Sequence, residues 1–152
     1  MGKMPTLDLF DLIDNKNEEM KEWIQTNWNE KNDIRLTDSE WFILNLINDK
    51  EILLADLAKN GKITRQGTHK LVKKLEEHGL VVTEKPKDNK RSKFVRLTPL
   101  GLDCYEANQA LRKHLEDNVR EAIGHEAFDL LKKMLAADWQ TETEREFVKG
   151  ER

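Results

Sequence analysis

Apolar residues recur along the chain at helical spacing in two early segments. Residues 7–30 carry a rough stripe of this kind, and a second one follows the segment Thr37–Glu40. Threonine followed three residues later by glutamate is a capping box, in which each side chain bonds the other residue's backbone amide. We therefore expect one helix over residues 7–30 and a second helix that begins at Thr37 and ends near Asn48.

The next segment predicts short elements separated by glycine. Residues 51–53 are long enough only for one edge strand or for the entry of a helix. Residues 54–60 predict a short helix that Gly61 ends as a C′ glycine. Thr64 is the expected N-cap of a further helix, which Gly79 closes. Its inward positions follow helical spacing, at Thr68, Leu71, Val72 and Leu75.

After this helix the pattern changes to that of strands. Residues 80–84 and 93–97 predict two strands, joined by a polar turn over residues 85–92. Together they form a hairpin with a basic tip. The pair Thr98-Pro99 is typical of a helix start, so a long helix is expected to run from there to Gly124. A last helix is expected to carry Phe128, Leu131, Leu135 and Trp139.

Charge is distributed unevenly along the chain. The 152 residues have a formal net charge of −3, but residues 62–96 hold eleven lysines and arginines against four acids. Residues 1–60 and 97–152 are acidic, with seven basic residues against thirteen acids and eight against twelve. A basic segment within an acidic chain indicates a nucleic-acid partner for that segment. With 38% hydrophobic and 36% charged residues, the chain can bury one modest core, which a second copy is expected to complete.

Other classes of protein are disfavoured by what the sequence lacks. Cys104 is the single cysteine, so neither an intrachain disulfide nor a zinc ribbon is expected. The histidines lack metal-ligand spacing, and no phosphate-binding glycine loop, nucleophile elbow or His-Glu-x-x-His motif occurs, so no metal, cofactor or catalysis is expected. No apolar run reaches the ~18–20 residues of a membrane span, and no signal peptide is expected. A cytoplasmic protein is therefore predicted.

The predicted order of helix, tight turn, second helix and basic hairpin is that of a helix-turn-helix with a wing. An α-helix about 10–12 Å across fits the major groove of duplex DNA, which is about 12 Å wide. The face opposite the inward positions carries side chains that bond base edges or phosphates. The expected DNA-binding residues on this helix and on the hairpin tip are Thr64, Arg65, Gln66, His69, Lys70, Lys73, Lys74, Lys87, Lys90 and Arg91.

Several short motifs, taken in order, resemble the MarR family of bacterial transcription regulators. The resemblance covers residues 36–103, and outside that span it rests on the order of helices alone, with one before and two after. The segments that carry it are Leu36–Leu44, Leu54–Ala58, Ile63–Gln66, Leu71–Val81, Arg91 and Leu97–Gly101.

This resemblance implies a mainly α-helical fold with a small β-hairpin, in which a winged helix-turn-helix core is flanked by N- and C-terminal dimerisation helices. The marR-type domain would span residues 1–140 and be followed by a polar tail over 141–152. Its parts would be dimerisation helices over 1–35 and 100–140, a winged core over 36–99, a helix-turn-helix over about 54–78 and a wing over 80–98.

The resemblance also implies a homodimer on a pseudopalindromic operator, acting as a repressor that a small-molecule effector relieves. It implies DNA contacts from residues 64–78 and from the wing residue Arg91. The family's wing has an aspartate two residues before this arginine, where Asn89 stands here with Asp88 beside it. Asparagine can still accept a hydrogen bond from the arginine, but it lacks the charge. The tryptophans are expected in the core or the dimer interface, and the alternative is that Trp23, Trp28 or Trp41 also lines an effector cavity.

A winged helix can also serve protein–protein contact without binding DNA, and this alternative stays open. The outward face of polar and basic residues separates the two readings, because an interaction module does not need it. Single-stranded nucleic acid is disfavoured, since it requires aromatic stacking platforms in the basic groove. All four tryptophans lie outside the basic segment, which contains one aromatic ring, that of Phe94.

Overall fold

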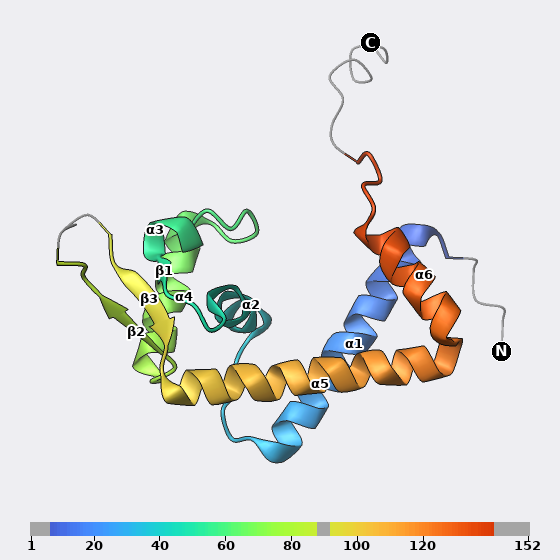
Figure 1. The fold of residues 1–152 in the computed structure, drawn as a ribbon, viewed down its shortest axis with the longest axis horizontal. Helices are drawn as coiled ribbons and strands as arrows, with labels where there is room; N and C mark the ends of the chain where they lie inside the picture. The colour runs from blue at the N-terminus through green and yellow to red at the C-terminus, as the bar shows by residue number, and fades with distance from the viewer. Residues whose placement is uncertain (1–6, 88–91, 142–152) are drawn as a thin grey trace, which may run out of the picture. The chain divides into compact units, whose positions relative to one another are not determined.

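The computed structural model describes residues 7–87 and 92–141, which form mostly helices together with one small sheet (Figure 1). The chain divides into two compact units, residues 1–115 and 116–152, and the winged helix lies in the first. The predicted fold class, mainly α with a β-hairpin, is confirmed. In chain order the elements are α1 (Leu9–Lys31), α2 (Asp38–Ile47), β1 (Ile52–Leu53), α3 (Leu54–Leu57), α4 (Arg65–Glu77), β2 (Val81–Glu84), β3 (Phe94–Leu97), α5 (Pro99–Ile123) and α6 (His125–Ala136).

Local side-chain hydrogen bonds begin the first two helices. The Asp8 carboxylate accepts a hydrogen bond from the Asp11 amide at 2.8 Å, so the predicted helix over residues 7–30 is confirmed with its cap at Asp8. At α2, Thr37 Oγ1 accepts from the Glu40 amide at 3.2 Å, and Glu40 Oε1 accepts from the Thr37 amide at 3.1 Å. This pair is the predicted capping box.

Three strands form one antiparallel sheet in the order β1-β3-β2. β2 and β3 are the predicted hairpin, with Val81 opposite Leu97 and Glu84 opposite Phe94. β1 pairs with the other edge of β3, so Ile52 and Leu53 supply the expected edge strand, and Leu53 is also the N-cap from which α3 begins. The backbone of β3 provides the hydrogen-bonding partner that so short a segment lacks by itself.

The predicted helix over residues 54–60 is wrong in its length. α3 ends at Leu57 with Ala58 as its C-cap. Gly61 has φ +81°, but it lies beyond that cap and is not a C′ glycine. The helix ends early because Asn60 bonds the turn with its side chain, including the Leu57 carbonyl at 3.0 Å.

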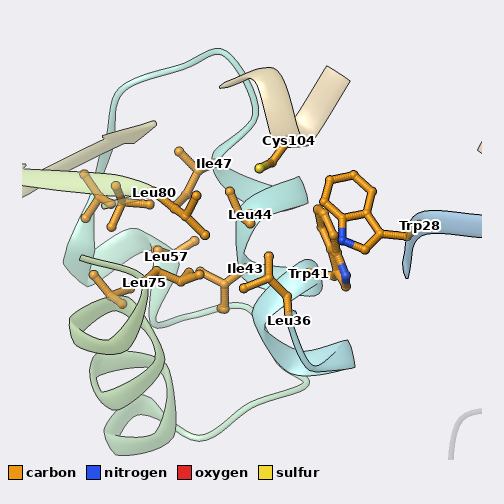
Figure 2. Close-up of a cluster of buried hydrophobic side chains, with 13 residues drawn as sticks. Trp28, Leu36, Trp41, Ile43, Leu44, Ile47, Leu57, Leu75, Leu80 and Cys104 are labelled. Carbon is orange, nitrogen blue, oxygen red and sulfur yellow. The ribbon is translucent and has the colours of Figure 1, made fainter. Parts of the chain in front are cut away.

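One hydrophobic core lies between α2, α3, α4 and the sheet (Figure 2). Trp28 of α1 packs edge-on against Trp41 at one end of it, with the ring centroids 4.7 Å apart. The Trp28 indole Nε1 donates to the Ile34 carbonyl at 2.7 Å, so its polar atom is satisfied in the interior. The side chains at the centre of the core are at most 1% exposed, and they are Ile43, Leu44, Ile47, Leu57, Leu75 and Leu80.

The end of α5 and α6 belong to the second unit. Phe128 is buried there, and the Arg120 guanidinium lies over its ring, 4.3 Å from the centroid. The predicted last helix is too long, because α6 ends at Ala136 and Trp139 lies past it. Carbonyl groups at the end of a helix have no partner within it. The Trp139 indole Nε1 satisfies one of them by donating to the Met134 carbonyl at 2.6 Å.

Candidate nucleic-acid interface

Helix α4 is positioned by its two ends and by its buried face. At its start, Thr64 Oγ1 accepts from the Gly67 amide at 3.0 Å, which confirms the predicted N-cap. At its end, Gly79 has φ +77°, the left-handed conformation that a C′ glycine adopts at low cost. The predicted inward face is confirmed, with Leu71 partly buried beside the buried side chains of Thr68, Val72 and Leu75.

Asn60 organises the turn between α3 and α4, a role that sequence reasoning missed. Its Oδ1 accepts from the amides of Lys62 and Ile63 at 2.8 and 2.7 Å. Its Nδ2 donates to the Leu57 carbonyl at 3.0 Å and to Thr68 Oγ1 at 2.9 Å. One side chain thereby joins the end of α3 to the buried face of α4. Asparagine followed by glycine is a frequent turn sequence, and this signal could have indicated the role.

The opposite side of α4 and its N-cap carry the predicted DNA-contact residues. Four of these side chains are basic, and the glutamine amide and the histidine imidazole can bond base edges. All of them are exposed: Thr64, Arg65, Gln66, His69, Lys70, Lys73 and Lys74.

Glu76, near the end of α4, is bonded to the wing. Its Oε2 accepts from the Thr83 hydroxyl at 2.6 Å and from the Thr83 amide at 3.1 Å. These two bonds fix strand β2, the base of the wing, to the helix. No local sequence pattern indicates the pair, because the two residues belong to different elements.

The structure describes the wing up to Lys87 and again from Ser92. Lys87 is exposed, whereas Asn89, Lys90 and Arg91 lie outside the described residues. Across the hairpin, Arg96 and Glu84 form an ion pair with 2.6 Å between Nη2 and Oε1. One basic residue of the segment 62–96 is therefore engaged within the wing itself.

Thr98 joins α4, the wing and α5. Its hydroxyl donates to the Gly79 carbonyl at 2.6 Å and accepts from the Gly101 amide at 3.0 Å, which is the predicted cap of α5. The Thr98 amide donates to the Leu80 carbonyl at 3.0 Å. At Gly101 the backbone of α5 comes so close to Leu80 that an added Cβ atom would lie 1.9 Å from the Leu80 carbonyl oxygen.

A cavity of about 280 Å³ lies between α1 and α5 within the first unit. Trp28 lines it, and Trp23 lies beside it with its indole edge-on to the His114 imidazole, 5.5 Å between ring centroids. Trp41 packs on Trp28 in the core and is 6% exposed. The lining consists of Asn27, Trp28, Lys31, Asn32, Ala107, Ala110, Leu111 and His114.

Cys104 is buried on α5 and packs as a core residue. Burial raises the pKa of its thiol, and the charge of neighbouring Asp103 raises it further. A raised pKa lowers the fraction of reactive thiolate at neutral pH. The environment of Cys104 therefore disfavours a role as a reactive thiol.

Over residues 7–87 and 92–141, no group of three or more His, Cys, Asp or Glu side chains is placed to hold a metal ion. Nor is any helix in them both long and apolar enough to cross a membrane.

Comparison with known proteins agrees with this geometry. Residues 36–101 match a family model described as a winged helix DNA-binding domain. The HTH-type transcriptional regulator FarR of Neisseria gonorrhoeae is 33% identical over 106 residues, which is 69% of this chain and 73% of FarR.

Solved structures give the same result. NadR in complex with 4-hydroxyphenylacetate is 27% identical, with a TM-score of 0.65 over 90% of this chain and 95% of that one. MepR of S. aureus bound to DNA is 19% identical and shares the fold, with a TM-score of 0.71 over 86% of this chain and 95% of that one. With the identity to FarR and the winged-helix match, these findings establish that the chain belongs to the MarR family of winged-helix, DNA-binding transcriptional regulators.

Proposed function

We propose that the protein is a homodimeric repressor that binds a pseudopalindromic operator through α4 and is released from it by a small aromatic acid. The exposed side of α4 is the observation that carries the DNA contact. The proposal includes no catalytic activity, and a cytoplasmic location follows from the DNA partner. The proposed contacts are Thr64, Arg65, Gln66, His69, Lys70 and Lys73 on and before the helix, and Lys87, Lys90 and Arg91 on the wing.

Exposed apolar side chains support a second copy of the chain as the partner. On α1, Leu9 and Phe10 are 61% and 77% exposed, and on α6, Leu130 and Met134 are 55% and 49% exposed. Apolar surface that gathers on a helix in this way usually marks an interface. In a two-fold symmetric dimer, two copies of α4 would enter successive major grooves about 34–36 Å apart, or ~10 base pairs.

Selection of bound duplexes from a random pool tests the proposal. We expect an inverted repeat whose half-sites lie ~10 base pairs apart. Direct repeats, or one half-site alone, would contradict the symmetric dimer. Phosphate contacts hold even non-specific duplexes at low salt. If no duplex is retained at ~50 mM salt, the alternative of a protein–protein interaction module is favoured instead.

Replacing Gln66 by alanine should weaken operator binding by about 1–3 kcal/mol and change random-DNA binding much less. Gln66 is exposed in the first turn of α4, where its amide can pair with an adenine edge. The measurement is the affinity of wild type and variant for the selected operator and for random duplexes, over a series of salt concentrations.

The matched control is Lys73→Met on the same helix. Lys73 is exposed and is expected to bind phosphate, so its loss should weaken both kinds of duplex and lower the salt slope by about one unit. If Gln66→Ala costs the same on operator and random DNA, α4 is not reading bases.

The cavity between α1 and α5 is the proposed effector site. Its lining combines the apolar side chain of Leu111 with the basic side chains of Lys31 and His114, a set suited to an aromatic carboxylate. NadR, which shares the fold, was solved with 4-hydroxyphenylacetate bound. Such a ligand would release the operator by binding the free protein more tightly than the DNA-bound form.

Replacing Ala110 by leucine should lower the affinity for 4-hydroxyphenylacetate at least about tenfold, because the added atoms occupy the cavity. Ala127→Leu, on α6 outside the lining, is the control and should keep the wild-type affinity. Binding is followed by tryptophan fluorescence, with release of the operator as a second readout. If the two variants bind 4-hydroxyphenylacetate with equal affinity, the ligand does not bind in this cavity.

A further inference from the structure

Glu40 is a buried carboxylate with one unsatisfied oxygen. Its side chain is 2% exposed. Oε1 accepts a hydrogen bond from the Thr37 amide at 3.1 Å in the capping box, but Oε2 is buried without a hydrogen-bond partner among the described residues. An uncompensated buried charge is strongly destabilising, so the position of any nearby cation matters.

Lys74 of α4 brings a cation to this carboxylate. Its Nζ lies 3.9 Å from Glu40 Oε1, and its side chain is 54% exposed, so the ammonium group lies at the edge of the interior. α2 and α4 pack against each other in the core, and the Glu40–Lys74 pair adds an ionic contact between the two helices. The neighbouring Lys73 is exposed and forms no ion pair within the part of the chain that the structure describes.

We propose that Lys74 is a positioning residue, which compensates the buried Glu40 charge and thereby sets how α4 lies on α2, and that it does not contact DNA. This inference rests on the proposed function, since it concerns the helix that reads the operator. It assigns different roles to two adjacent lysines that the sequence pattern treats alike. Lys73 binds phosphate, and Lys74 acts through Glu40.

The salt dependence of DNA binding separates the two roles. Lys73→Met should lower the slope of log affinity against log salt by about one unit, because one phosphate contact is lost. Lys74→Met should leave this slope unchanged and lower affinity for the selected operator about fivefold, because α4 is no longer held on α2. The Lys74→Met variant should also melt about 3 °C below wild type, as followed by circular dichroism.

A double-mutant cycle with Glu40→Gln tests whether Lys74 acts through Glu40. Glutamine keeps the shape and an oxygen for the Thr37 amide but removes the buried charge. In the Glu40→Gln background, Lys74→Met should therefore cost neither operator affinity nor melting temperature.

Each outcome has a defined reading. A salt slope that falls by about one unit in Lys74→Met would make Lys74 a phosphate contact and overturn the inference. Additive losses in the Glu40→Gln cycle would overturn it as well. If Glu40→Gln does not fold, the salt slope of DNA binding by Lys74→Met alone decides between a positioning role and a phosphate contact. A wild-type protein that binds no duplex, or a normal slope in Lys73→Met, would count against the proposed function itself.

Discussion

Replacing Gly101 by alanine is expected to lower the free energy of unfolding by at least about 3 kcal/mol. The added Cβ atom would lie 1.9 Å from the Leu80 carbonyl oxygen and 2.9 Å from its carbon, and both are backbone atoms that cannot turn aside. The same oxygen accepts a hydrogen bond from the Thr98 amide at 3.0 Å. Moving it would break this bond, which helps to join α4, the wing and α5. Alanine also stabilises a helix by roughly 1 kcal/mol relative to glycine, but this gain is smaller than the free-energy cost of the overlap with the Leu80 backbone.

Gly67→Ala provides the control for this prediction. Its Cβ atom would meet two side-chain atoms, Ile63 Cγ2 at 3.1 Å and the N-cap oxygen Thr64 Oγ1 at 2.9 Å. Weakening this cap costs about 1 kcal/mol, which the higher helix propensity of alanine offsets. We expect its stability to stay within about 1 kcal/mol of wild type. Urea unfolding of the three proteins measures the difference, and a Gly101→Ala variant as stable as Gly67→Ala would contradict the close approach of α5 to Leu80.

Asn60→Ala is expected to cost about 2–3 kcal/mol of stability and to weaken operator binding. Alanine leaves the amides of Lys62 and Ile63 without their acceptor and removes the bond to Thr68 Oγ1 on the buried face of α4. The largest share of this cost is expected at Thr68 Oγ1, because Thr68 is fully buried and loses its hydrogen-bond partner. The start of α4 then loses its link to α3, and with it the position of Gln66 that the proposed operator contact requires.

Asn60→Asp separates the two halves of this network. Aspartate keeps an acceptor for the two turn amides but cannot donate to the Leu57 carbonyl or to Thr68 Oγ1. We expect it to fall between wild type and Asn60→Ala in urea unfolding and in operator affinity. If the alanine variant alone loses stability while both keep full operator affinity, the turn does not control the placement of α4.

Much of the candidate DNA-binding surface could be predicted from the sequence, because it depends on interactions within a few residues. The capping box of Thr37 and Glu40, the N-cap at Thr64 and the C′ glycine at Gly79 are all local patterns. Once Thr68, Val72 and Leu75 are known to face inward, a period of 3.6 residues places the exposed side of α4 without further information.

Local patterns fail where a partner is distant along the chain. The segment 51–53 becomes a strand only because β3 pairs with it, and α3 stops at Leu57 because the Asn60 amide bonds the turn. Trp139 fits the helical stripe but lies beyond α6. In each case a tertiary or turn hydrogen bond outweighs the weak preference of a few residues for helix.

The sequence by itself therefore determined the order of the elements, the basic middle segment and the residues that α4 exposes. Only the tertiary structure decided that Glu40 is buried beside Lys74, that Glu76 holds the wing through Thr83 and that Gly101 lies against Leu80. The physical reason is the distance along the chain over which each kind of interaction acts. Capping and periodicity act within one or two helical turns, whereas these contacts join separate elements, and their distances arise only when the core has packed.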